Sequence, residues 1–131
     1  MAASESYPDD LKYHAEHDWA RVDGDEATLG VTWFAQDALG ELVHYEAPEA
    51  GSTVTKDQSY GEVESVKAVS DVIAPLSGEV LEVNRAVADA PETVNDDPYG
   101  EGWLIRIRMS DPGEVESLMD ADAYRAHVAE Q

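Results

Sequence analysis

Lys67 is the residue of this chain whose type and setting point most directly to chemistry. Lysine is scarce, with only three in 131 residues, whereas Asp and Glu together number 29. Lys67 stands between two segments, 59–66 and 69–74, whose apolar and β-branched residues predict strands. Only Lys67 and Ala68 separate the two segments. So short a connection predicts a tight hairpin with Lys67 at its tip, although neither Gly nor Asn marks the turn. A lysine there projects into solvent, where another enzyme can modify its amine.

Several blocks of sequence, in order along the chain, carry a family resemblance. The segment Gly61–Asp71, GEVESVKAVSD, resembles the lipoylation motif of the glycine cleavage system H protein family. Further blocks that resemble the family are LKY at 11–13, HDW at 17–19, GVT at 30–32, AQ and LG within 35–40, PLSGEV at 75–80, VN at 83–84, and N, PY and GW within 95–103. The resemblance implies that lipoate is attached to Lys67 through an amide, inside a motif recognised by a lipoylating enzyme. The motif residues around the lysine are Glu64, Ser65, Val66, Ala68 and Asp71.

The resemblance also implies a carrier without catalytic activity of its own. Its expected role is to shuttle the aminomethyl group of glycine from glycine decarboxylase (P protein) to aminomethyltransferase (T protein). Dihydrolipoyl dehydrogenase (L protein) then reoxidises the dithiol, and the lipoylating enzyme completes the set of partners. The cofactors of these enzymes belong to the enzymes, and lipoate is the cofactor expected on this chain.

A shelter for the loaded arm is a further implication of the resemblance. In this family the loaded arm folds back against the protein near its opening segment, where a carboxylate can pair with the amine of the cargo. The matching positions are Glu16, His17 and Asp18, together with Asp71 beside the lysine hairpin. Ala38 stands where some members have histidine, so one polar contact of this groove is expected to be absent.

Other roles compete with the shuttle. A lipoyl or biotinyl domain of an acyl-transfer or carboxylase complex is usually shorter and joined to other domains by linkers. Biotinyl lysine is expected between methionines, whereas Val66 and Ala68 flank Lys67. A further alternative is an H-like protein that relays lipoate to other enzymes, and the sequence does not distinguish this role from the shuttle. An enzyme is the weakest alternative, because no nucleophile, histidine partner or Gly-rich phosphate loop accompanies acid pairs such as Glu62 and Glu64.

The composition limits the class of protein and its partners. With 131 residues and 43% hydrophobic content, the chain is predicted to be one carrier domain, residues 1–131. Its net charge of −21, spread along the whole sequence, indicates adaptation to high intracellular salt such as that of halophilic archaea. Eight basic residues make nucleic acid and anionic membranes unfavourable partners. The segment 1–10 has no targeting features and no apolar run reaches about 18 residues, so we expect a cytoplasmic protein.

Cysteine is absent, so any thiol must come from an attached group. His14 and His17 are too few and wrongly spaced for a metal site without cysteine ligands, and no metal is expected.

The pattern of strands and breaks predicts a mainly β fold. Expected strands lie at 18–22, 27–31, 42–45, 54–55, 79–84 and 103–108, in addition to the lysine hairpin. The sequence Asp23-Gly24-Asp25 is typical of a hairpin turn, and the apolar residues of 79–84 alternate so poorly that a local irregularity is expected. By resemblance, these strands form a barrel-sandwich hybrid of two small antiparallel sheets, as in lipoyl domains.

Helices are expected at one interior position and at the end of the chain. Thr32 is expected to cap a helix over 33–39 that Gly40 ends. Residues 111–131 are expected to form two short helices. Asp111, Pro112 and a reciprocal Glu114 begin the first, and Asp120 caps the second over 121–129. Residues 1–10 are expected to be loose, and 85–102 to form a long surface loop with one helical turn.

The net charge also predicts a dependence of stability on salt. Carboxylates crowded on a chain of charge −21 repel one another at low ionic strength, and dissolved ions screen that repulsion. We therefore expect the melting temperature, measured by circular dichroism, to rise markedly between low and molar KCl. A melting temperature that stays flat across this range would contradict the high-salt interpretation of the acidity.

Overall fold

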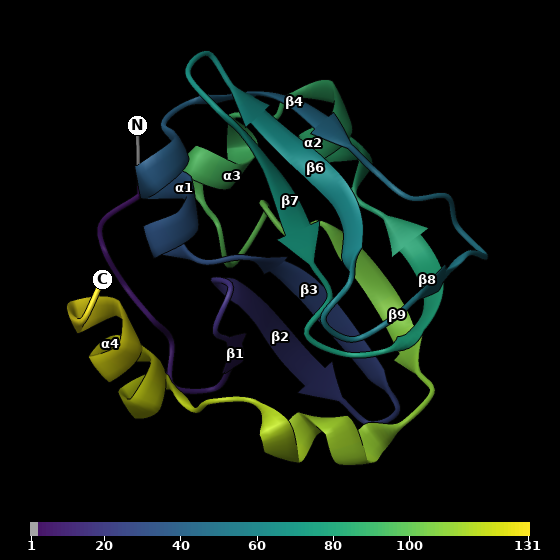
Figure 1. Cartoon of the computed structure of the whole chain (residues 1–131). Coiled ribbons are helices and arrows are strands. Elements are labelled where there is room, and N and C mark those ends of the chain that lie inside the picture. Colours follow the sequence, from purple (N-terminus) through teal and green to yellow (C-terminus); the bar gives the residue numbers. More distant parts are fainter. Residues whose placement is uncertain (1–2) are drawn as a thin grey trace.

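Two antiparallel sheets form the body of the molecule, which a computed structural model describes over residues 3–131 (Figure 1). The larger sheet has six strands in the order β1-β2-β3-β9-β8-β5. Their bounds are Lys12–His14, Asp18–Asp23, Glu26–Val31, Ile105–Met109, Gly78–Val83 and Thr53–Val54. The predicted mainly β fold with two antiparallel sheets and short helices is confirmed. The sheets are unequal in size, and neither closes into a barrel.

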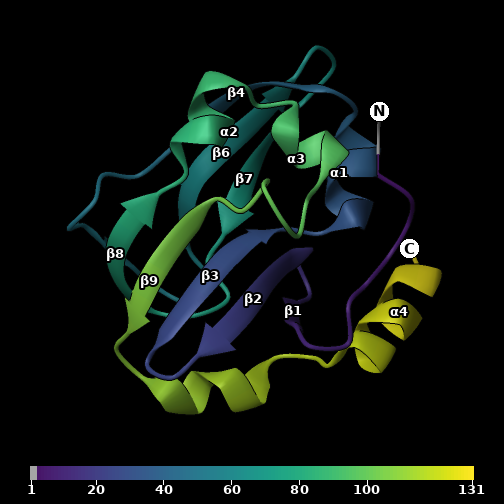
Figure 2. The ribbon, with the colours of Figure 1, turned by 180° about the vertical axis from the view of Figure 1, so that it is seen from behind.

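The smaller sheet carries the lysine hairpin. Its strands β4 (Leu42–Glu46), β6 (Ser59–Ser65) and β7 (Val69–Ile73) lie in the order β4-β6-β7. The two strands predicted around Lys67 are thus β6 and β7, joined through residues 66–68. The tip of this hairpin lies at the edge of the molecule in two views related by a half-turn (Figures 1 and 2).

The helix boundaries follow local capping rules. Helix α1 runs over Trp33–Leu39, where the Thr32 side chain accepts a hydrogen bond from the Ala35 N–H and Gly40 ends the helix. Helix α4 runs over Ala121–Ala129 and is capped by Asp120. Both were predicted with these bounds.

The first C-terminal helix is a 3₁₀ helix, η1, over Pro112–Ser117. Asp111 caps it by accepting from the Gly113 N–H. The predicted reciprocal role of Glu114 is wrong, because its carboxylate instead accepts from the backbone N–H and the hydroxyl of Ser77, at 2.8 and 3.0 Å. Glu114 therefore ties the C-terminal segment to the turn before β8.

The region 85–102 is more ordered than the sequence predicted. It contains two one-turn helices, α2 (Arg85–Asp89) and α3 (Thr93–Asp96), in place of a surface loop with one helical turn. Val87 and Val94 of these helices are fully buried in the main core. Helices of this length hold too few turns for a 3.6-residue period to appear in the sequence, which is why the pattern was missed.

One apolar core contains buried residues of both sheets, and a second cluster includes residues of α4, the helix at the C-terminal end of the chain in Figure 2. In the second cluster Trp19 is fully buried opposite Gly30 on the neighbouring strand. A Cβ atom at Gly30 would come within 2.6 Å of the Trp19 ring, so glycine is required for the ring to lie there.

The N-terminal segment joins this second cluster. Tyr7 is buried, and the Ala3 carbonyl accepts a hydrogen bond from the Trp33 indole N–H at 2.8 Å. Residues 3–10, expected to be loose, thus have specific contacts, and residues 1–2 lie outside the described part. No helix within residues 3–131 is long and apolar enough to cross a membrane.

Candidate functional site

The turn at the hairpin tip is held by the side chain of Ser65. The Ser65 hydroxyl oxygen accepts from the backbone N–H groups of Lys67 and Ala68, at 3.3 and 3.2 Å. The Ser65 N–H in turn donates to the Ala68 carbonyl at 2.8 Å. A buried serine therefore supplies the local hydrogen bonds that Asn or Gly provides in other tight turns, which explains how a turn without those residues forms.

The Lys67 side chain is exposed and lies beside Gly40, the residue that ends α1. A Cβ atom on Gly40 would be 3.5 Å from Cε and 3.9 Å from Nζ of Lys67. Gly40 has a φ of 85°, a conformation that favours glycine. The carbonyl end of a helix carries partial negative charge, which attracts the lysine ammonium. Gly40 was predicted only as a helix stop, and its position under Lys67 was missed.

Asn95 of α3 fixes the backbone on which Lys67 rests. Its amide nitrogen donates to the Gly40 carbonyl and to the Gln36 side chain, both at 2.9 Å. Its amide oxygen accepts from the Leu42 N–H, also at 2.9 Å. The region predicted as a surface loop therefore braces the segment between α1 and β4 beside the lysine.

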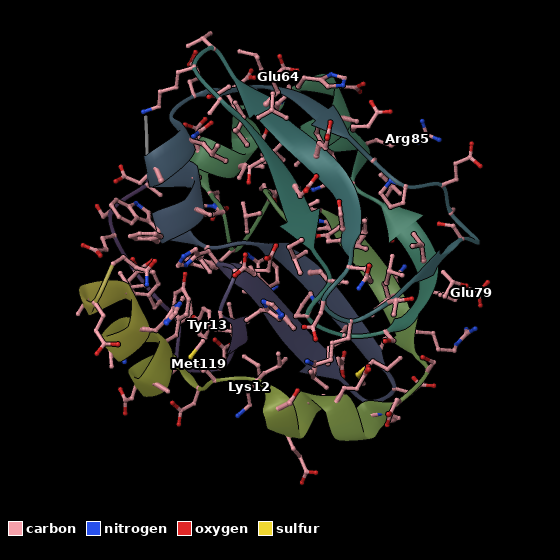
Figure 3. All side chains as sticks on the ribbon, viewed as in Figure 1. Lys12, Tyr13, Glu64, Glu79, Arg85 and Met119 are labelled. Atoms are coloured by element: carbon pink, nitrogen blue, oxygen red, sulfur yellow. The ribbon has the colours of Figure 1, made fainter. Side chains whose placement is uncertain are left out.

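The other motif residues lie on the outer side of the small sheet. Glu64, Val66, Ala68 and Asp71 are all exposed, and Glu64 lies near the tip end of β6 (Figure 3). Val66, next to the lysine, has 86% of its surface exposed. These side chains are open to a protein that approaches Lys67, whereas Ser65 faces inward.

His17 links the opening segment to α1 and α4. Its Nδ1 lies 2.7 Å from the Tyr124 hydroxyl, which lies 2.8 Å from the Thr32 hydroxyl. Burial, and then the neighbouring His127, lower the pKa of His17. His17 is half-buried in this network, while the adjacent Glu16 is exposed.

Asp18 is the unusual acid of the site, because it is only 2% exposed. The backbone N–H of Ile73, at the far end of β7 from the tip, favours the charged form of the Asp18 carboxyl and so opposes part of the effect of burial on its pKa. The Oδ1 atom of Asp18 is buried and has no hydrogen-bond partner within residues 3–131, and the same holds for the hydroxyls of Tyr45 and Tyr60. Burial raises the pKa of Asp18 well above its usual range. Asp18 thus reaches the strand that carries Asp71, whereas Asp71 itself lies on the exposed face.

Other features of the surface lie away from Lys67. Hollows of about 660 and 760 Å³ lie between residues 5–9 and α4, and between residues 48–50 and α2. His14 contacts Asp57 at 2.7 Å. Within the described part of the chain, no three His, Cys, Asp or Glu side chains gather in a way that could hold a metal ion.

An exposed lysine amine on a turn held by its own hydrogen bonds is an arrangement typical of carrier domains. The model of the family described as glycine cleavage H-protein matches residues 11–131. The glycine cleavage system H protein of Anaeromyxobacter sp. (strain K) is 55% identical over 95% of this chain and 97% of its own length. That of Marinobacter nauticus is 52% identical over 93% and 95%. The crystal structure of such an H protein from Mycobacterium marinum superposes with a TM-score of 0.86, at 43% identity, over 93% of this chain and 98% of that one.

The chain belongs to the glycine cleavage H-protein family. It has the lipoyl-carrier role of that family in glycine cleavage and is not itself catalytic, as the resemblance implied.

The burial of Asp18 predicts a pH dependence of stability. Because its pKa is higher in the folded chain than in the unfolded chain, stability is lost as pH rises above the unfolded value of about 3.9. Asp18→Asn removes this loss and should raise the free energy of unfolding near pH 7 by on the order of 1 kcal/mol. The gain, measured by urea unfolding, should shrink toward pH 4. Asp23→Asn, at the exposed end of the same strand, is the control, and an equal gain at all pH values would contradict the prediction.

Proposed function

We propose that Lys67 is the lipoate attachment site of this carrier. The observation that carries the proposal is the exposed Lys67 amine at the tip of a turn fixed by Ser65. The lysine side chain lies beside Gly40, the residue that ends α1, and is exposed to solvent. Once attached, lipoate supplies the dithiol that the chain, which has no cysteine, cannot supply itself. The amide bond also removes the charge of the ammonium, so its attraction to the end of α1 is lost.

The partners follow from this proposal. A lipoylating enzyme attaches the arm, with Glu64, Val66, Ala68 and Asp71 as the accessible part of the motif and Ser65 as the residue that shapes it. Glycine decarboxylase, aminomethyltransferase and dihydrolipoyl dehydrogenase then take the arm in turn. The cytoplasm, at high salt, is the proposed setting. Relay of lipoate to other enzymes would use the same lysine and remains the alternative role.

The shelter for an amine cargo is proposed to include Asp18, Asp71, Glu16 and His17. Asp18 supports this most directly, because a buried carboxylate oxygen without a partner favours a cationic donor. The backbone N–H of Ile73, which lowers the pKa of Asp18 against the effect of burial, belongs to β7 at the base of the lysine hairpin. Asp71 and Glu16 contribute exposed carboxylates, and His17 holds the turn before Asp18 against Tyr124.

Replacement of the lysine tests the attachment site. Lys67→Arg should keep the fold, with a change in stability within about 0.5 kcal/mol, because the side chain is exposed. It should reduce glycine cleavage, reconstituted with the partner enzymes, to background. Intact mass after expression in a lipoylating host should show the modification in the wild type and in Lys12→Arg, a matched exposed lysine, but not in Lys67→Arg. Full activity of Lys67→Arg would exclude this attachment site.

Loss of the shelter is tested by the lifetime of the cargo. Lipoylated protein in the disulfide form is loaded with the aminomethyl group by glycine and glycine decarboxylase, the enzyme is removed, and the release of ammonia is timed. Asp18→Asn and Asp71→Asn should each shorten the lifetime several-fold, because an ion pair with the amine is lost. Glu64→Gln, on the same sheet face as Asp71, should not. If both Asp variants keep their cargo as long as the wild type does, the assignment of these residues to the shelter is wrong, and the carrier role is unaffected.

A further inference from the structure

Exposed apolar side chains gather around the lysine tip. Four large hydrophobic residues of the described chain are exposed, and three of them lie on the small sheet or in its hairpin turn: Val43 at 49%, Val66 at 86% and Val69 at 58%. Val66 is adjacent to Lys67, and Val69 pairs with Glu64 across the hairpin. Val43 lies at a bulge of β4 beside the tip end of β6. On a chain of charge −21, this is an unusual place to leave apolar surface in water.

A row of carboxylates borders these valines on the same face. Glu46 pairs with Glu62, and Glu62 pairs with Asp71, so three acids lie side by side across β4, β6 and β7. All three are exposed. Like charges in directly opposed positions destabilise a sheet, which means that this arrangement costs stability in the isolated protein.

We infer that this outer face is the docking surface for glycine decarboxylase, the enzyme that loads the arm of Lys67. The face consists of Val43, Val66 and Val69 around the lysine and the acidic row Glu46, Glu62 and Asp71. The complementary surface has an apolar collar around the opening that admits the arm and basic residues outside that collar. The inference rests on the proposed attachment at Lys67.

Charge argues for a different protein as the occupant and against a second copy of this chain. Two copies docked through this face would bring two acidic rows together, and like-charge contacts across an interface are unfavourable. A basic surface instead neutralises the row and relieves its internal repulsion.

The two parts of the face respond differently to salt. At about 1 M salt the Debye length is about 3 Å, so attraction between exposed charges is largely screened. Burial of apolar surface is not weakened in this way, and many salts strengthen it. The valines therefore hold the complex when salt is high, and the acidic row accelerates and orients encounter when salt is low.

The experiment measures the KM for fully lipoylated carrier in glycine decarboxylation by glycine decarboxylase, at low and at molar KCl. Lipoylation is verified by intact mass, because Val66 lies next to the modified residue. Val66→Ser combined with Val69→Thr should raise the KM about tenfold at both salt concentrations, with kcat unchanged. Val22→Thr is the matched control, since Val22 is 38% exposed on β2 of the other sheet and should leave the KM unchanged.

The acidic row is tested separately. Glu46→Gln combined with Glu62→Gln should raise the KM about threefold at low salt and leave it unchanged at molar KCl. Glu92→Gln with Glu116→Gln, at positions outside the face, removes the same charge and should have no comparable effect. A KM that none of the tip-face variants alters would overturn the inference.

Two further results distinguish a failure of the docking face from a failure of the proposed lipoyl-carrier function. Inactivity of lipoylated wild-type protein would contradict the proposed function, whereas active wild type with unaltered valine variants would contradict the docking face alone. Sedimentation of the wild type is expected to show a monomer. A dimer that dissociates in the valine variant would assign the face to a second copy and overturn the assignment to an enzyme.

Discussion

The packing of the small sheet on the large one determines where Lys67 is presented. Leu42, Val63 and Val72 of the small sheet are buried in the same core as Leu29 and Ile107 of the large sheet. Because side chains alternate along a strand, burying one face of the hairpin turns the other face, with its carboxylates and valines, to solvent. A shift of the hairpin by one residue would exchange these faces, so the core fixes the register that places the lysine at the tip.

The charges of the molecule are divided between its surface and one interior position. Nearly all carboxylates are solvated, and several are held in pairs such as Arg106 with Glu26 and Glu82. Asp18 departs from this rule, since it is buried near Tyr60, and this burial raises its pKa. The burial of this carboxyl therefore costs stability in the isolated fold.

The sequence predicted what depends on short-range rules. Thr32, Gly40 and Asp120 begin or end helices through contacts within a few residues, and those boundaries were found. The position of Lys67 at a hairpin tip followed from strand patterns on either side. The contacts that shape the site join distant residues, such as Asn95 with Gly40, and no local period encodes them. One-turn helices in 85–102, which supply Asn95, carried no periodic signal for the same reason.

The fixed turn at Ser65 has a consequence for how fast an attached group finds its target. Hydrogen bonds to the N–H groups of Lys67 and Ala68 restrict the backbone of the turn. The flexible link between the folded domain and a group attached at Nζ therefore consists of the lysine side chain and the arm. In a docked complex this short tether confines the reactive end to a small volume, so its effective concentration at the partner's active site is high. Delivery then depends on the geometry of docking and not on diffusion of a mobile loop.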